Sequence, residues 1–245
     1  MLSQNKIILN SNTVKSKKME RLGIELFNSG TNRFHAEETV DLYDSTFMDY
    51  IMDTKVKPRE KNVILHDYKQ TREFCLFLRN FFIENDMFDT YISKNPHKVR
   101  FNNNDDIFCH IRLGDTLGFY DHSKIFDYYD KILSTTKFEN GYIASDTIQH
   151  PICQMLLKKY NLQPYNSDDI DTIHFASTCK NLALSSGTYS WLMGFLGSYP
   201  GSISQIYYPK ILKMWHGDIL FMMIGQWFQL IDHFVKYIKI FMYIL

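Results

Sequence analysis

The pattern of hydrophobic and polar positions is clearest from residue 105 onward, where short apolar runs alternate with longer segments of helical spacing. The predicted strands, each an apolar run bounded by polar residues, are 107–109, 142–144, 182–184 and 203–208. The predicted helices, each with apolar residues at helical spacing, are 126–133, 151–160, 171–179 and 191–196. Asp169 or Asp171 is predicted to cap the third of these helices. Strands alternating with helices are typical of a parallel, Rossmann-type sheet, so we predict an α/β fold.

The first part of the chain has a weaker pattern. Residues 63–65 predict a strand, and residues 71–82 predict a strongly amphipathic helix. Helical spacing recurs over residues 14–28, whereas the polar stretch 85–104 predicts a loop. We expect residues 1–104 to form a reduced amino-terminal lobe.

The last part of the chain is apolar but interrupted. Residues 105–217 would form the Rossmann-like lobe, and residues 218–245 a separate carboxyl-terminal helix. Six polar residues interrupt this last segment, namely Gln226, Gln229, Asp232, His233, Lys236 and Lys239. So many polar groups argue against a spanning helix. We predict a helix packed across the lobes; the alternative is peripheral contact with a membrane surface.

Candidate chemistry follows the predicted strand at 107–109. His110 and Arg112 come at its end, two residues apart, so on an extended backbone both side chains point to one face. Gly114 then allows the backbone to turn. Hydrogen-bond donors at the carboxyl end of a strand suit an anionic ligand. The alternative is a buried strand followed by an ordinary turn with a surface arginine.

A second candidate follows the predicted strand at 182–184. Ser186, Gly187 and Thr188 come where a strand gives way to an apolar helix. Free amides at a helix amino terminus, joined by hydroxyls, form a ready phosphate site. The alternative is simple N-capping by Ser186 or Thr188. The strand end after 107–109 is basic, and the strand end after 182–184 is rich in hydroxyls and amides. Together they favour a site that binds a diphosphate from two sides.

These segments resemble the GDP-fucose-dependent fucosyltransferases, especially the α-1,2-fucosyltransferases. Residues 110–115 read His-Ile-Arg-Leu-Gly-Asp, against His-x-Arg-Arg-Gly-Asp in the family. Residues 185–191 read Ser-Ser-Gly-Thr-Tyr-Ser-Trp, close to Ser-x-Ser-Thr-Phe-Ser-Trp-Trp. Residues 141–146 resemble the family's strand ending in Ser-Asp or Thr-Asp, and residues 66–82 resemble its Gly-Tyr-x-Gln segment and following helix. The similarity runs from about Val63 to Pro209.

The resemblance implies a GT-B-like, metal-independent glycosyltransferase that moves fucose from GDP-fucose to a glycan or glycoprotein hydroxyl with inversion. The chain departs from the pattern at Leu113, where the family has a second arginine, and it lacks the family's amino-terminal Gly-Gly-x-Gly-Asn-Gln loop. Donor binding is therefore better supported than acceptor identity or turnover. The alternatives are the same architecture with another nucleotide sugar, or a non-catalytic descendant that binds a glycan or a partner.

Roles for single residues follow from the resemblance. Arg112 would contact a diphosphate oxygen, and Asp115 would orient Arg112 or the turn, or act as general base. His110 would hydrogen-bond the donor or order the loop; the alternative is a histidine with a purely structural role at the strand end. The remaining expected donor-binding residues are Gly114, Ser145, Ser185, Ser186, Gly187, Thr188 and Ser190. Asp146 and Asp169 are expected at the nucleoside end, where a carboxylate can accept from guanine; both could equally be helix caps.

Composition excludes several other functions. Lysines plus arginines and aspartates plus glutamates are each 27, and this zero net charge does not favour nucleic-acid binding. The four cysteines form no Cys-x-x-Cys pair, so a zinc site is not expected. No Gly-x-Gly-x-x-Gly fingerprint supports a nicotinamide or flavin cofactor. The apolar run near the amino terminus is too short for a signal peptide, so a cytoplasmic location is expected.

Overall fold

The computed structural model describes residues 38–52, 61–65, 72–114 and 122–209. Its strands are β1 (Glu38–Leu42), β2 (Lys61–Leu65), β3 (Ile107–Ile111), β4 (Gly141–Ser145), β5 (Gln163–Pro164), β6 (Asn181–Ala183) and β7 (Gln205–Tyr207). Its α-helices are α2 (Asp44–Met52), α3 (Arg72–Glu84), α4 (Met87–Lys94), α5 (His122–Thr135), α6 (Pro151–Tyr160), α7 (Asp169–Ala176) and α8 (Thr188–Gly197). A short 3-10 turn covers Lys98–Arg100.

The main sheet is parallel throughout. It has five strands in the order β5-β4-β3-β6-β7. From β3 the chain winds outward through β4 to β5, then crosses back to β6 on the other side of β3 and continues to β7. The direction of winding therefore reverses between β3 and β6. This confirms the predicted α/β fold with a Rossmann-like parallel sheet.

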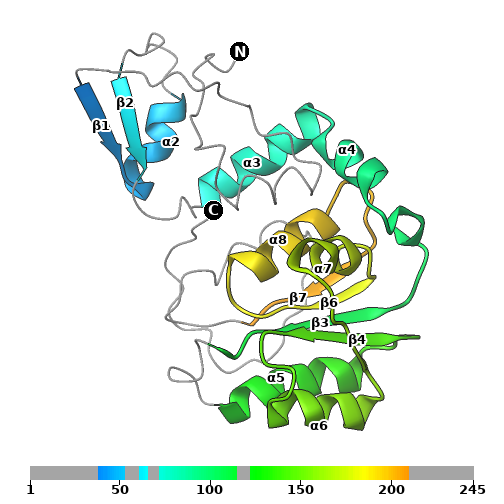
Figure 1. The fold of residues 1–245 in the computed structure, drawn as a ribbon. Coiled ribbons are helices and arrows are strands. Elements are labelled where there is room, and N and C mark those ends of the chain that lie inside the picture. Colours follow the sequence, from blue (N-terminus) through cyan, green and yellow to red (C-terminus); the bar gives the residue numbers. More distant parts are fainter. Residues whose placement is uncertain (1–37, 53–60, 66–71, 115–121, 210–245) are drawn as a thin grey trace.

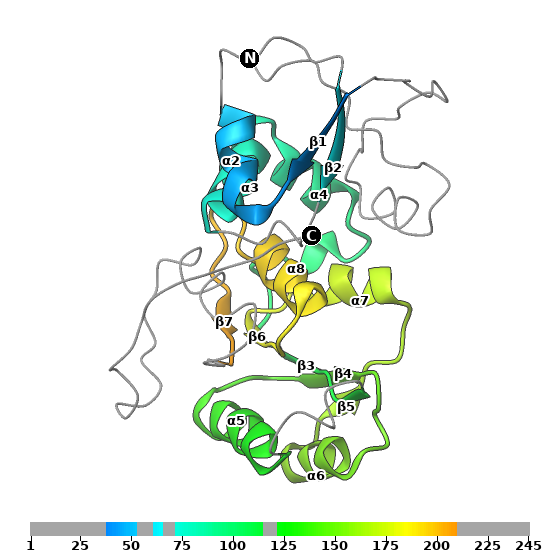
Figure 2. The same cartoon turned by 90° about the vertical axis from the view of Figure 1, so that its left-hand side faces the viewer.

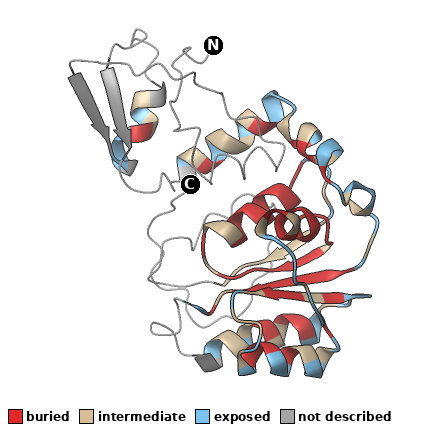
Figure 3. Cartoon of the chain, in the orientation of Figure 1, coloured by how far each residue is buried: buried red, intermediate tan, exposed pale blue. Residues whose placement is uncertain are grey.

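Helices cover both faces of this sheet. Two views at right angles show α5 and α6 on one face and α7 and α8 on the other (Figure 1, Figure 2). Side chains of β3 alternate between the two faces of the sheet, and each face is covered by a hydrophobic core. Ile107, Cys109 and Ile111 belong to the core beneath α5 and α6, whereas Phe108 belongs to the core on the opposite face. Every residue of β3 is buried, as Figure 3 shows.

Most elements of this sheet were predicted, but the start of α7 was not. The predicted helix at 151–160 coincides with α6. The helix predicted at 171–179 instead spans Asp169–Ala176, and its cap is Asp168 rather than Asp169 or Asp171. The Asp168 carboxylate accepts hydrogen bonds from the amides of Ile170 and Asp171, both at 2.9 Å. Adjacent aspartates are equally good caps in sequence, so only the geometry distinguishes them.

The predicted loop at 85–104 is wrong, because it contains α4. Burial of Phe88 and Tyr91 explains this helix. The Phe88 ring lies 5.4 Å from that of Phe195 on α8, and the Tyr91 hydroxyl hydrogen-bonds the Ser177 hydroxyl at 2.7 Å. Tertiary packing thus stabilises a helix whose local sequence is polar and turn-rich.

The elements before residue 105 belong to two separate parts of the fold, a small two-stranded sheet and the core of the main sheet. β1 and β2 form a parallel pair joined to α3 through α2, where the rings of Phe47 and Phe74 meet at 5.3 Å. In contrast, α3 shares the core of the main sheet, with Phe82 packed edge-on against Phe195 at 5.0 Å. The lobe boundaries and the GT-B architecture stay predictions. The predicted segments 14–28 and 218–245 lie outside the described residues.

Within the described ranges, no helix is both long and apolar enough to cross a membrane.

Candidate functional site

The candidate site, called the crevice below, lies where β3 and β6 stop pairing at their carboxyl ends, the topological position at which open α/β sheets bind ligands. Their pairing ends at Cys109 and Ala183. Beyond this point, the His110 carbonyl accepts a hydrogen bond from the Tyr129 hydroxyl at 2.6 Å, and the Leu184 carbonyl accepts one from the Tyr128 hydroxyl at 3.0 Å. Buried carbonyls need such partners, so two tyrosines of α5 support the sheet where its strands separate.

Arg112 and Gly187 meet across this crevice. Arg112 follows β3, and Gly187 follows β6. Gly187 has a φ of 117°, and a Cβ at this position would lie 2.6 Å from Nη1 of Arg112. The guanidinium therefore lies directly against the backbone of Gly187. Both the backbone conformation and the close approach require glycine here.

The amino terminus of α8 is not capped by a side chain. Its N-cap residue is Gly187, so the alternative of capping by Ser186 or Thr188 is wrong. The first helical hydrogen bond runs from the Trp191 amide to the Gly187 carbonyl at 3.0 Å. The preceding amides of the first turn have no acceptor within the helix. These amides follow Gly187 directly in the chain, and Gly187 is the residue against which the Arg112 guanidinium lies.

His110 is buried behind this crevice. Its Nδ1 hydrogen-bonds the Ser190 hydroxyl at 2.5 Å, and its ring meets the ring of Tyr189 edge-on at 5.0 Å. Burial lowers the pKa of His110 to about 4; the positive charge of Arg112 lowers it as well, while Asp146 opposes the shift. The imidazole is therefore neutral near pH 7. Ser190 is fully buried and its hydroxyl is committed to His110, so we expect it to act through that ring.

Asp146 holds the turn that follows Arg112. Its Oδ1 accepts the amide of Leu113 at 3.0 Å, and its Oδ2 accepts the amide of Gly114 at 2.9 Å. The neighbouring Ser145 hydroxyl accepts the Thr147 amide at 3.1 Å. Asp146 is therefore not a helix cap. Its carboxylate joins the end of β4 to the turn after β3.

The other predicted residues are placed as follows. Asp169 is the first residue of α7, and its carbonyl accepts a hydrogen bond from the Tyr189 hydroxyl at 2.7 Å, which joins the starts of α7 and α8. Ser185 is buried, and its hydroxyl lies within hydrogen-bonding reach of Tyr129. Asp115 lies outside the described residues. Because β3 pairs in parallel with both β4 and β6, the carboxyl ends of these three strands lie at one edge of the sheet.

The supporting tyrosines were missed by the sequence analysis. Burial raises the pKa of Tyr128 and of Tyr129 far above the usual value, so both hydroxyls remain protonated donors. In the sequence they belong to the apolar face of a predicted helix, and nothing distinguishes them from ordinary core aromatics. Tyr208, whose hydroxyl accepts the Gly187 amide at 3.2 Å, was also missed.

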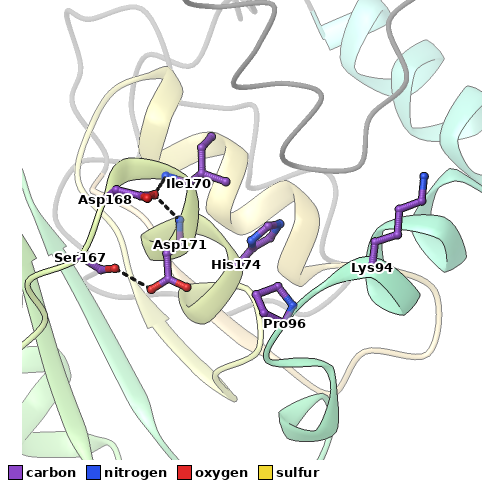
Figure 4. Close-up of a pocket in the computed structure, with 7 residues that line it drawn as sticks. All are labelled: Lys94, Pro96, Ser167, Asp168, Ile170, Asp171 and His174. Atoms are coloured by element: carbon purple, nitrogen blue, oxygen red, sulfur yellow. Dashed lines mark hydrogen bonds between the residues drawn. The ribbon is translucent and has the colours of Figure 1, made fainter.

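An open pocket of about 510 Å³ lies elsewhere, between α4 and α7 (Figure 4). Its lining residues are Lys94, Pro96, Ser167, Asp168, Ile170, Asp171 and His174. Burial pushes the pKa of Asp171 upward, but hydrogen bonds from Tyr165, Ser167 and His97 outweigh this and lower it to about 2. Because this carboxylate is already satisfied and the pocket includes no residue of the crevice, we assign the site to the crevice.

Comparison with protein-family models, with curated proteins and with solved structures yields no match. Among the residues that the structure describes, no three His, Cys, Asp or Glu side chains gather as metal ligands would. Metal independence therefore rests on the sequence resemblance.

Proposed function

We propose that the crevice between β3 and β6 binds the diphosphate of a nucleotide sugar, and that the protein is a glycosyltransferase. The observation that carries this proposal is the contact of the Arg112 guanidinium with Gly187 at the point where the winding reverses. Ligands of open α/β sheets bind outside the carboxyl ends of the strands at such a point.

The chemistry of the crevice suits a diphosphate. A guanidinium can hold two oxygens of one phosphate through parallel hydrogen bonds. The first amides of α8 and the positive end of its dipole favour the same negative charge. His110 supports the arrangement as a neutral ring, because a buried neutral group does not compete with Arg112 for the anion.

The proposed reaction is a direct displacement with inversion. The oxygen of an acceptor hydroxyl bonds to the anomeric carbon as the bond from that carbon to the diphosphate breaks. The bonding electrons leave with the diphosphate, whose developing charge Arg112 and the α8 amides stabilise. The hydroxyl proton passes to a base, and the motif makes Asp115 the candidate for this role. No covalent enzyme intermediate is needed.

The identity of the donor rests on the resemblance to the α-1,2-fucosyltransferases. We propose GDP-fucose as donor, a glycan or glycoprotein as acceptor and a GT-B-like arrangement of the lobes. A metal is not required in this scheme, since Arg112 and the amides supply the positive potential.

A second candidate function is donor binding without transfer. Leu113 stands where the family has its second arginine, and it is fully buried in the core beneath α5 and α6. An arginine could not occupy this apolar position without burying its charge. This difference favours a non-catalytic descendant, in which binding persists and turnover does not.

The test of the proposal is calorimetric titration with GDP, UDP, CDP and ADP. We expect binding, with GDP the tightest. Arg112→Ala should weaken GDP binding by about 2–4 kcal/mol, and Arg112→Lys should recover part of the loss because an ammonium cannot form the fork. Lys137→Ala removes an exposed cation before β4 and is the matched control. Absent or equal binding of all four diphosphates would contradict the proposal.

A transfer assay separates the two candidates. GDP-fucose and other GDP-sugars are incubated with a glycan panel, and release of GDP is measured. Turnover that depends on both donor and acceptor supports the glycosyltransferase, whereas GDP binding without turnover supports the non-catalytic descendant.

A further inference from the structure

We infer that Asp146 is a positioning residue, whose carboxylate holds the turn after β3 so that Arg112 faces Gly187. This inference rests on the proposed diphosphate site and differs from the role in guanine recognition that the motif suggests for Asp146. In this role Asp146 holds Arg112 in place and does not itself contact the ligand.

The geometry of the turn carries the inference. β3 and β4 pair in register up to Ile111 and Ser145. The residue that follows β4 is Asp146, and its two carboxylate oxygens accept the amides of Leu113 and Gly114 at 3.0 and 2.9 Å. The carboxylate therefore continues the connection between the strands after their own pairing has ended, immediately beyond Arg112.

Close packing supports the same conclusion. A Cβ at Gly114 would lie 2.6 Å from Oδ2 of Asp146, so the carboxylate rests directly on the backbone of this glycine. The hydroxyl of Thr147 also reaches Oδ1, at 3.3 Å. With each oxygen already bonded to a backbone amide, the simplest role of Asp146 is to fix the turn.

The arrangement also explains why two glycines surround Arg112. Gly114 admits the carboxylate that holds the turn, and Gly187 admits the guanidinium that the turn presents.

Two variants break the clamp in different ways. Asp146→Asn keeps the shape but places an amide donor opposite one of the two backbone amides. Gly114→Ala leaves Asp146 intact and displaces its Oδ2; Gly114 has no left-handed φ, so alanine suits its backbone. Asp168→Asn is the matched control, because Asp168 also accepts two backbone amides but at the start of α7.

The experiment titrates the full chain with GDP and with inorganic pyrophosphate, which has no base. We expect Asp146→Asn and Gly114→Ala each to lower the affinity for GDP and for pyrophosphate by the same factor, about tenfold or more. The factor is the same because both ligands share the charge-assisted contact between phosphate and Arg112. A double variant that combines either substitution with Arg112→Ala should bind each ligand as tightly as Arg112→Ala does alone. If Asp146 acts only through Arg112, its loss has no further effect once Arg112 is gone, so the losses in a double-mutant cycle are not additive. Asp168→Asn should leave pyrophosphate binding unchanged.

Amide hydrogen exchange tests the clamp without a ligand. Exchange at Leu113 and Gly114 should accelerate in Asp146→Asn relative to the Asp168→Asn control, with global stability measured on the same samples. Unchanged exchange at both amides would overturn the inference, as would additive losses with Arg112→Ala. A loss confined to GDP would instead place Asp146 at the base. If the unaltered protein binds neither ligand, the proposed function fails; the exchange result then reports on the clamp alone.

Discussion

Gly187 meets two demands at one position. Its φ of 117° strains any residue with a side chain, and its Cα faces Nη1 of Arg112. We predict that Gly187→Ala lowers GDP affinity at least tenfold, about 1.4 kcal/mol, while the protein stays folded. Gly201→Ala is the control, since Gly201 has a φ of 85° but open space around its Cα. Unfolding and GDP titration on the same samples would show whether affinity falls only in the first variant; equal affinity in both would return residues 186–190 to a purely structural role.

His110 makes stability depend on pH in a defined window. Its pKa is about 4 in the folded protein, lowered by burial from an ordinary value of 6.5. Between these values the unfolded chain takes up a proton that the folded protein does not. Stability is therefore lost as the pH falls through this window, by up to about 3 kcal/mol. His110→Gln should show a flatter dependence in denaturant unfolding from pH 7 to pH 4; parallel curves would contradict the assignment.

The same window bears on the site. Protonated His110 would place a second positive charge beside Arg112 and disturb the bond to Ser190. Near pH 7 the neutral ring instead fixes the first turn of α8 through Ser190.

Helix α5 supports strand β3 by a hydrogen bond as well as by core packing. Tyr129 donates to the His110 carbonyl at the end of β3, and this hydrogen bond is buried. We predict that Tyr129→Phe costs about 1–3 kcal/mol of stability, because it leaves a buried carbonyl unsatisfied. Tyr207→Phe is the control, since that hydroxyl contacts the half-buried side chains of Thr136 and Gln205. The denaturant midpoints of the two variants compare their losses of stability. Equal losses would mean that Tyr129 contributes through packing alone and that its hydrogen bond adds nothing.

Strand β3 is the element on which the site depends most. It lies in the centre of the sheet, it is buried on both faces, it contains His110, and it leads to Arg112. A rigid central strand can place a charged group precisely, because its neighbours on both sides fix its direction. The turn that follows it is fixed by Asp146, the residue after β4.

Across the chain, all four cysteines are free and buried. Burial raises the pKa of the Cys179 thiol to about 12 and raises the pKa of Cys75, Cys109 and Cys153 as well. Since thiolates are the reactive form, we predict that iodoacetamide at pH 8 labels none of them in the folded protein. Labelling should appear with global unfolding. Mass spectrometry would locate the label, and rapid modification of one cysteine under native conditions would contradict this packing.

The sequence by itself determined the local structure of the main sheet. Apolar runs such as 107–109 predicted strands, and helical spacing predicted α6 and most of α8. It also placed the candidate chemistry, because polar residues that follow a buried strand must lie at its carboxyl end. These properties depend on neighbouring residues, so the periodicity of the chain is enough to reveal them.

The tertiary structure decided which of these ends meet. The sheet order sets β6 beside β3, and this brings Arg112 to Gly187. It also selected Asp168 as the cap of α7, gave Asp146 the turn amides as partners, and stabilised α4 through Phe88. Each of these contacts joins residues that are far apart in the chain or chooses between equivalent neighbours. Local pattern carries no information on such choices, because their free energy comes from packing and hydrogen bonds that exist only once the sheet has formed.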